Sequence, residues 1–425
     1  MAGSRITAGI VATGSELLAG RVRDANGPWI AERLGRLGVD VVEIVLVGDR
    51  PEEMDAALRS LSGVDLIVTS GGLGPTADDL TAAVVADLTG RPLELDEHME
   101  KVVGDIISRF ADRLRWDADA LAEANRKQAM VPRGATAIRP AGTAPGLAVP
   151  PGDGVPTVLV LPGPPREVHA MWDDAVASAP VQALLERTEP FLETHLRLFG
   201  VPESEIAATL RAVGEHTDLA PLEIVTCLRD FSLEVDLRRR PGDEAAETAH
   251  DAVVAEIDAR HGAAVFSRTG QTIDELLFDL LSGHTIATAE SCTGGLLAGR
   301  LTEPAGASAH VQGGIVSYSN EAKANLLGVP QDVLDTHGAV SVPAVQAMAQ
   351  GAIDRFGVDV AVAISGIAGP GGGTEQKPVG YVCFCVRTAD GTEIVRDPVL
   401  PGERGDVRER SVVLAMHLVR RILTG

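Results

Sequence analysis

The sequence predicts an α/β protein in which two α/β domains with largely parallel sheets are joined by a small α+β module. The 425 residues exceed what one hydrophobic core usually holds. Strand-like apolar runs alternate with amphipathic helix-like segments near both ends of the chain, which is typical of parallel sheets covered by helices. In the middle of the chain, glycine-rich loops give way to charged, leucine-rich segments. We therefore expect domains at 1–176, 177–267 and 268–425.

The first domain is expected to alternate strands and helices. Apolar runs predict strands at 6–12, 39–47 and 64–69, and apolar stripes at helical spacing predict helices at 26–37 and 51–61. This order predicts a mostly parallel sheet with helices on both faces. Ligands of such sheets bind beyond the carboxyl ends of the strands.

Glycines and acidic residues follow these three strands. Gly14 follows the first strand, Asp49 follows the second, and Ser70-Gly-Gly-Leu-Gly-Pro-Thr-Ala-Asp-Asp79 follows the third. Glycine lets backbone approach a phosphate closely, and aspartates at a helix start can hold a metal or a ribose hydroxyl. A tight turn followed by capping aspartates has the same composition. The pattern alone is compatible with both interpretations.

The middle segment is expected to form a separate module. Strands are predicted at 193–199 and 232–238, and helices at 203–213 and 243–261. The basic cluster Arg238–Arg240 is interpreted as a solvated strand end.

The last domain resumes the alternation, and its centre is predicted to be Glu290-Ser-Cys-Thr-Gly-Gly295, which joins a buried strand at 285–289 to a helix. Unpaired N–H groups and the helix dipole favour an anion or a developing oxyanion at such a helix start. Ser291 can cap the helix there or attack a carbonyl. The remaining elements are expected as helices at 272–281 and 343–356 with a closing helix to 423, and as strands at 314–317, 359–364 and 380–386.

A tyrosine and a lysine follow the strand at 314–317. Tyr318 ends this strand, and Lys323 lies in the first turns of the next helix, so both can face one pocket. A serine hydroxyl needs a base to become a strong nucleophile, and a partly desolvated lysine is such a base. Cys292 is the alternative nucleophile, because a thiolate at a helix N-terminus has a lowered pKa. No Gly-x-Ser-x-Gly elbow surrounds Ser291, which argues against an α/β-hydrolase.

Composition excludes several classes of protein. The net charge of −23 argues against a protein that mainly holds nucleic acid. Neither a run of about 18 apolar residues nor a signal-peptide core is present, so a cytoplasmic location is expected. Four cysteines without zinc-ligand spacing predict neither a disulfide framework nor a zinc site.

Three motifs of the last domain occur in the order found in one family. Thr288-Ala-Glu-Ser-Cys-Thr-Gly-Gly295, Tyr318-Ser-Asn-Glu-Ala-Lys323 and Ser365-Gly-Ile-Ala-Gly-Pro-Gly-Gly-Gly373 resemble the C-terminal domain of the CinA family of competence/damage-inducible proteins. Stand-alone versions of that domain, known as PncC, are nicotinamide mononucleotide deamidases. The resemblance implies that Ser291 is the nucleophile, that Tyr318 and Lys323 relay its proton, and that the domain uses no cofactor.

The same resemblance implies a set of residues that bind the mononucleotide. In this set, Arg404 or Arg408 would hold the 5′-phosphate. Glu403 stands where the usual family pattern, Gly-Asp-Arg, has its aspartate. The implied set is Glu290, Cys292, Thr293, Gly294, Gly295, Asn320, Ser365, Gly366, Gly369, Arg404 and Arg408.

The first domain resembles the N-terminal half of the same family, which has the molybdopterin-binding fold shared with MogA and MoeA. The resemblance implies an ADP-ribose pyrophosphatase that needs potassium and a divalent cation, Co²⁺, Mg²⁺ or Mn²⁺, held by Asp78 and Asp79. Relatives often carry asparagine where Arg139-Pro-Ala precedes Gly142. The implied binding residues are Gly14, Glu16, Asn26, Asp49, Gly71, Gly72, Gly74, Thr76, Asp78 and Asp79.

The middle module corresponds to a KH-like connecting domain in this family. The GXXG loop of nucleic-acid-binding KH domains has no counterpart here, so we expect a spacer or dimerisation element. The expected partners are small nucleotides and a second copy of the chain, and neither nucleic acid nor a membrane is expected. A non-catalytic nucleotide- or pterin-binding scaffold linked to competence or DNA damage is the alternative function.

Overall fold

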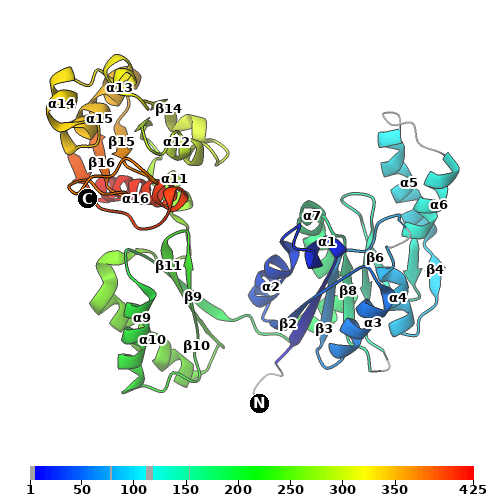
Figure 1. Ribbon diagram of the computed structural model, residues 1–425. Helices are drawn as coiled ribbons and strands as arrows, with labels where there is room; N and C mark the ends of the chain where they lie inside the picture. The colour runs from blue at the N-terminus through cyan, green and yellow to red at the C-terminus, as the bar shows by residue number, and fades with distance from the viewer. Residues whose placement is uncertain (1–4, 77–78, 112–117, 153) are drawn as a thin grey trace. The chain divides into compact units, whose positions relative to one another are not determined.

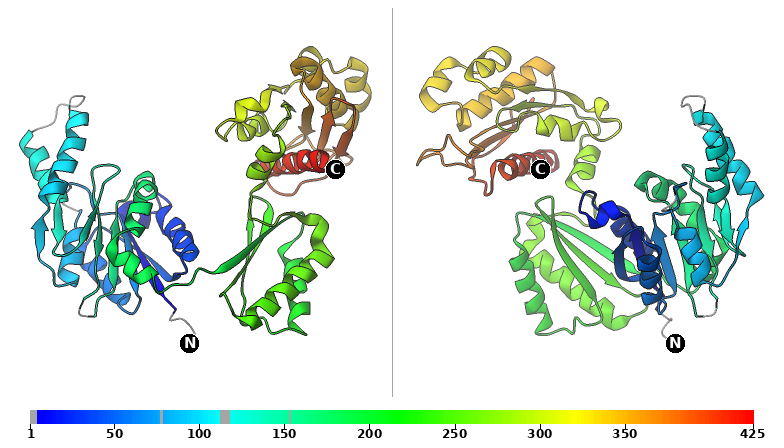
Figure 2. Two further views of the ribbon diagram at one scale, coloured as in Figure 1. Left: turned by 180° about the vertical axis from the view of Figure 1, so that it is seen from behind. Right: turned by 45° about the vertical axis from the view of Figure 1, so that its right-hand side comes forward.

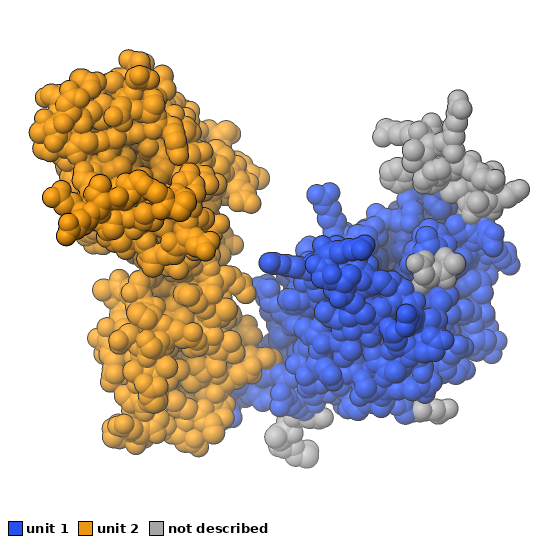
Figure 3. Space-filling model, in the orientation of Figure 1, with its two compact units in different colours: residues 1–192, 240–243 blue, residues 193–239, 244–425 orange. Residues whose placement is uncertain are grey.

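The fold is described from a computed structural model of the chain (Figure 1). It describes residues 5–76, 79–111, 118–152 and 154–425. The chain forms two compact units (Figure 3), one of residues up to 192 with 240–243, the other of residues 193–239 with 244–425.

The first unit is built on a six-stranded sheet. Its strand order is β2-β1-β3-β8-β7-β6, of which the first four strands run parallel and the last two antiparallel. The strands are β1 (Thr7–Thr13), β2 (Asp40–Val47), β3 (Leu66–Ser70), β6 (Thr136–Ile138), β7 (Gly146–Val149) and β8 (Thr157–Leu161). β3 and β8 are buried along their whole length, which explains their continuous apolar sequence.

Helices cover both faces of this sheet, as the alternation predicts. One face packs on α2 (Asn26–Arg36), α7 (Pro165–Val176) and α8 (Ala179–Leu185), and the other packs on α3 (Pro51–Ser60) and α4 (Thr81–Leu88). The shorter or peripheral elements are α1 (Ser15–Leu18), β4 (Leu93–Leu95), α5 (Glu97–Ala111), α6 (Ala118–Gln128) and β5 (Met130–Pro132).

The first core continues beyond the boundary expected at residue 176. Val181 and Leu184 of α8 are buried in the same core as α2 and α7. The compact unit accordingly runs to Leu192, and the connecting module begins with the next strand. An amphipathic helix that follows a domain closely gives no sequence signal of which core it joins.

The connecting module has a four-stranded sheet with two helices on one face (Figures 1 and 2). Strand order is β10-β11-β9-β12. The predicted strands and helices are present, and β10 and β12 are additional. The elements are β9 (Leu192–Phe199), α9 (Glu203–Gly214), β10 (Glu223–Arg229), β11 (Ser232–Arg239), α10 (Glu244–His261) and β12 (Val265–Ser267).

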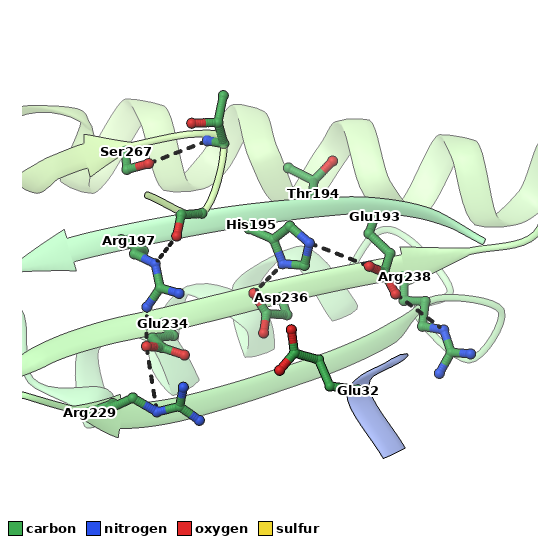
Figure 4. A network of polar contacts seen from close by, with 12 residues as sticks. Glu32, Glu193, Thr194, His195, Arg197, Arg229, Glu234, Asp236, Arg238 and Ser267 are labelled. Atoms are coloured by element: carbon green, nitrogen blue, oxygen red, sulfur yellow. Dashed lines mark hydrogen bonds and ion pairs between the residues drawn. The ribbon is translucent and has the colours of Figure 1, made fainter. Parts of the chain in front are cut away.

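The other face of this sheet carries a polar network (Figure 4). His195 Nδ1 lies 2.8 Å from Asp236 Oδ1, and Arg197 pairs with Glu234. Arg238 is only 19% exposed and pairs with Glu193 at 3.7 Å, so the solvated strand end expected for the basic cluster is wrong at this residue. Acidic partners on neighbouring strands, which sequence spacing does not reveal, compensate its charge.

The last domain contains a five-stranded sheet of order β14-β13-β15-β16-β17, in which the first three strands are parallel. α15 (Val342–Phe356) covers one face, and α11 (Ile273–Leu280), α12 (Leu296–Leu301) and α16 (Arg404–Thr424) cover the other. The remaining elements are β13 (Ile286–Glu290), β14 (Val311–Val316), α13 (Asn320–Leu327), α14 (Gln331–His337), β15 (Val360–Gly366), β16 (Val382–Thr388) and β17 (Glu393–Arg396).

The α/β fold class with largely parallel sheets is therefore confirmed. Within the described ranges, none of the helices combines the length and the apolar character needed to cross a bilayer.

Close packing of α13 on α15 gives the first testable prediction. A Cβ at Gly351 of α15 would lie 1.8 Å from the backbone oxygen of Leu327, so neither group can move away cheaply. We expect Gly351→Ala to destabilise the domain by about 2–3 kcal/mol, which lowers the urea midpoint of its unfolding. Gly299→Ala in α12 meets open space and is the control, expected to be neutral or stabilising by up to about 1 kcal/mol. Equal midpoints for the two variants would contradict this packing.

Candidate active site

The loop Ser291–Gly295, called here the nucleophile loop, joins β13 to α12 at the carboxyl end of the parallel strands. The backbone N–H of Ser291 donates to Ile364 of β15 at 2.9 Å, which ties the loop to the sheet. Gly294 and Gly295 have φ of 64° and 94°, a left-handed conformation that glycine adopts without strain. The chain thereby turns from strand to helix within a few residues.

Ser291 and Lys323 meet inside the domain. Lys323 Nζ donates to Ser291 Oγ at 3.0 Å and to the backbone oxygen of Ser317 at 2.8 Å. Lys323 is 1% exposed and Ser291 is 8% exposed. Burial lowers the pKa of Lys323 below its ordinary value, because an ammonium loses its hydration there. A neutral amine in this position can accept the proton of the serine hydroxyl.

Cys292, the alternative nucleophile, is buried beside Ser291. Its thiol is 6% exposed, and burial raises its pKa to about 11. The thiolate is therefore scarce near neutral pH, and the geometry favours Ser291.

Tyr318 is not part of this pair. Its side chain is 63% exposed, and its hydroxyl accepts a hydrogen bond from Arg404 Nη2 at 3.4 Å. In the described part of the chain no hydrogen bond joins it to Ser291 or Lys323, so the expected proton relay through Tyr318 is not formed. Ser317 turns inward at the end of β14, and the next side chain therefore points outward.

Glu290 caps α12. The carboxylate is fully buried and accepts hydrogen bonds from the N–H groups of Gly295, Leu297 and Ala298 at 3.0, 3.1 and 2.9 Å. Charge at a helix N-terminus is stabilised by these donors. The Glu290 carboxylate thus orders the loop. Its hydrogen bonds go to the protein's own backbone, in place of the direct substrate contact expected for it. Nor does Ser291 cap the helix, because the N-cap position belongs to Gly295.

Two arginines of α16, Arg404 and Arg408, hold loops of the site. Arg408 donates from Nε to the backbone oxygen of Cys292 at 3.1 Å and from Nη2 to that of Thr293 at 2.9 Å. Arg404 donates to the backbone oxygen of Gly369 at 2.8 Å and is exposed. Arg408 therefore supports the nucleophile loop, in place of the phosphate contact expected for it, whereas Arg404 is reachable from solvent.

The glycine-rich loop after β15 is shaped by packing. A Cβ at Gly366 or Gly369 would lie 2.6 Å from Val382 or Val379. Larger residues at these two positions would clash with the valine side chains, so packing within the protein is sufficient to explain both glycines. Ser365 is buried and donates to the backbone oxygen of Ala339 at 2.7 Å.

Backbone donors remain at the turn of the nucleophile loop. Among the described residues, the N–H groups of Cys292 and Thr293 donate to no oxygen, and both face the Cys292 sulfur. Thr293 is buried, and its Oγ1 has no partner within the same residues. Asn320, the first residue of α13, is exposed.

The two largest cavities described for the first unit lie at the carboxyl edge of its sheet. The larger, of about 360 Å³, is lined by Glu16, Asp24 and Asn26, and the smaller, of about 110 Å³, by Asp79 and Gln128. The position beyond the strand ends agrees with the prediction for ligands of parallel sheets.

A buried amide lines each cavity. Asn26 donates from Nδ2 to Ser70 Oγ at 2.8 Å and to the backbone oxygen of Gly163 at 2.7 Å. Gln128 donates to the backbone oxygen of Leu73 at 3.2 Å. The amide oxygens of Asn26 and Gln128 are buried without a partner in the described chain, which is unusual and leaves them open to a ligand donor. Sequence reasoning missed Gln128, because it lies on a helix with no motif around it.

The glycine-rich loop after β3 is ordered by its own side chains. Gly71 and Gly72 have φ of 110° and 66°, and Thr81 Oγ1 donates to the backbone oxygen of Gly71 at 2.9 Å. Asp79 Oδ2 accepts from the backbone N–H of Thr76 at 2.9 Å. A Cβ at Gly74 would lie 2.4 Å from that carboxylate oxygen. The loop therefore holds Asp79 against its own backbone.

The other predicted residues of this site lie beside β1 and β2. Asp49 accepts from the backbone N–H of Ser15 at 2.9 Å, and Gly14 donates to the backbone oxygen of Val47 at 3.0 Å. Glu16 is exposed.

The metal site expected at Asp78 and Asp79 is only partly visible. Asp78 lies outside the described residues, and the described ones contain no cluster of three metal-ligating His, Cys, Asp or Glu side chains. In the described part of the chain Asp79 Oδ1 accepts no hydrogen bond, so one carboxylate oxygen fits a cation.

Known proteins resemble the chain over nearly its whole length. Residues 270–423 match the family described as the CinA C-terminal domain, and residues 9–183 match the probable molybdopterin binding domain. A CinA-like protein of Mycobacterium sp. (strain JLS) is 56% identical over 422 residues, 98% of each chain. That of Mycobacterium tuberculosis (strain ATCC 25177 / H37Ra) is 51% identical over 98% of this chain and 97% of its own.

A solved structure matches part of the chain. The crystal structure of the competence/damage inducible protein CihA from Agrobacterium tumefaciens is 41% identical, covers 36% of this chain and 96% of its own, and has a TM-score of 0.35.

The thiol environment gives a prediction that separates the two candidate nucleophiles. Cys227 is exposed, whereas Cys292 is buried with a pKa of about 11. Iodoacetamide at pH 8 should therefore alkylate Cys227 at least about tenfold faster than Cys292, measured by peptide mass spectrometry. Urea-unfolded protein is the control, in which both should react alike. Faster labelling of Cys292 in the folded protein would support the thiol as nucleophile.

Proposed function

Because the chain belongs to the CinA family, we propose that its last domain hydrolyses the carboxamide of nicotinamide mononucleotide, which yields nicotinate mononucleotide and ammonia. The observation that carries this proposal is the 3.0 Å hydrogen bond between Lys323 Nζ and Ser291 Oγ in a buried setting. A serine paired with a desolvated lysine suits acyl transfer.

The proposed reaction begins with neutral Lys323. Its amine accepts the proton of Ser291 Oγ while Oγ bonds to the carboxamide carbon. The N–H groups of Cys292 and Thr293 are the donors proposed for the resulting oxyanion. The Lys323 ammonium then gives its proton to the leaving nitrogen, which departs as ammonia. Water, deprotonated by the same amine, hydrolyses the acyl-serine and restores both groups.

The entrance of the site is proposed to bind the mononucleotide. Arg404 is exposed beside the hydroxyl of Tyr318, and its charge suits the 5′-phosphate. The Tyr318 ring is exposed and suits contact with the pyridine ring. In this proposal Tyr318 contacts substrate, and Lys323 alone moves the serine proton.

We further propose that the first unit hydrolyses ADP-ribose or a related NAD-derived diphosphate. The amide oxygens of Asn26 and Gln128, which have no partner within the described residues, support it, since Asn26 lines the larger cavity and Gln128 the smaller one. These two amide oxygens are hydrogen-bond acceptors in separate cavities, which suits a diphosphate with a sugar-bearing group at each end. Asp79, with Asp78, would hold the divalent cation, which as a Lewis acid would neutralise charge on the diphosphate.

Substitution of the nucleophile tests the amidase proposal. Ser291→Ala removes the attacking oxygen, so ammonia release from nicotinamide mononucleotide should fall by roughly 1000-fold or more. Cys292→Ala is the matched control and should retain activity within about threefold, because it keeps the backbone donors. Release is measured by a coupled ammonia assay. Unchanged activity in Ser291→Ala would reject Ser291 as the nucleophile.

A second substitution tests the diphosphate proposal. Asp79→Asn retains an oxygen for the Thr76 N–H but removes charge from the cation site. We expect ADP-ribose hydrolysis to fall roughly tenfold or more and to require a higher Co²⁺, Mg²⁺ or Mn²⁺ concentration. Asp87→Asn, exposed on α4, is the control with the same charge change. Saturable ADP-ribose binding without turnover under any cation would favour the scaffold alternative.

A further inference from the structure

The turn between β10 and β11 in the connecting module is strained. Asp230 and Phe231 have φ of 49° and 57°, and they are the only non-glycine residues with positive φ in the described chain. Two-residue hairpin turns of this shape favour Asn-Gly, because a Cβ is unfavourable there. Strain that persists in a folded protein indicates that other contacts maintain it.

Both side chains of this turn contact the last domain. Asp230 pairs with Arg300 of α12, with Arg300 Nη1 and Asp230 Oδ1 3.3 Å apart. Arg300 is also held by Asp274 of α11 through two hydrogen bonds of 2.7 Å. The Phe231 ring lies under the guanidinium of Arg410 in α16, 4.3 Å from its carbon to the ring centre.

The two contacted helices are the ones that hold the nucleophile loop. α12 follows the loop directly, and Glu290 caps its first turn. α16 carries Arg408, which binds the backbone oxygens of Cys292 and Thr293 two residues before Arg410. The hairpin turn therefore contacts two of the elements that support the loop, α12 through Arg300 and α16 through Arg410.

We propose that the Asp230-Phe231 turn positions the nucleophile loop, and that the connecting module thereby sets the rate of the amidase. The choice of nicotinamide mononucleotide as substrate rests on the proposed function, whereas the positioning of the loop by the turn is independent of it. Asp230 and Phe231 are positioning residues, because they act through α12 and α16. When the turn is changed, Arg300 keeps its ion pair with Asp274. Loss of the turn contacts therefore weakens the support of the loop but does not remove it.

The test replaces the turn in the full chain by Asp230→Asn with Phe231→Gly. Asn-Gly is the pair that this turn prefers, so the hairpin is kept while the charge and the ring are removed. Asp258→Asn is the matched control, since it removes an exposed ion pair of the same module with Arg268. Amide hydrogen exchange of 291–298 is measured by mass spectrometry, together with kcat and KM for nicotinamide mononucleotide.

We expect exchange of 291–298 to accelerate roughly 3- to 10-fold in the turn variant and not in the control. kcat should fall by roughly the same factor with KM within about twofold, because the turn does not contact substrate. Unchanged exchange in that segment would overturn the proposal. Faster exchange throughout the domain with a lowered unfolding midpoint would also overturn it, as a purely structural role. If the wild type releases no ammonia from nicotinamide mononucleotide, the proposed amidase function is rejected. The exchange of 291–298 then decides by itself whether the turn positions the loop.

Discussion

The hydrogen bond between Lys323 and Ser291 depends on burying a lysine amine, and much of the last domain can be understood from that requirement. A buried ammonium is costly, so Lys323 is driven toward its neutral form. In the proposed mechanism, this burial makes Lys323 the base that takes the proton of the Ser291 hydroxyl. The parallel arrangement of β13 and β14 brings the two residues together, since both strands end at the same edge of the sheet.

Several charged residues around this pair support the backbone. Glu290 is buried, forms no ion pair within the described residues, and accepts hydrogen bonds from N–H groups at the start of α12. Arg408 binds backbone oxygens on the other side of the loop. The loop is thus held from both sides by charge-assisted hydrogen bonds, which are stronger than neutral ones. These contacts also allow a distant element, the Asp230-Phe231 turn, to reach the loop through the helices that bear them.

Much of the fold and part of the site could be predicted from the sequence. The strands and helices of both α/β domains are periodic enough to be placed, and the parallel order explains why Ser291 and Lys323 share one edge. The outward direction of Tyr318, the cap at Glu290 and the use of Arg408 on backbone could not be predicted. Each depends on which way a side chain turns at a strand end, or on which backbone groups lie nearby in three dimensions, and neither is encoded in residue spacing. Gln128 could not be predicted either, because no motif surrounds it on its helix.

The most direct test of the account is the pH dependence of kcat/KM for nicotinamide mononucleotide hydrolysis between pH 6 and 10. In the proposed mechanism the active base is the neutral amine of Lys323, so kcat/KM should rise with pH as this group loses its proton. Burial lowers its pKa from the ordinary 10.5, so the rise should level off below that pH. A rate that falls across this range, or that keeps rising with the pKa of a solvated lysine, would contradict Lys323 as the buried base.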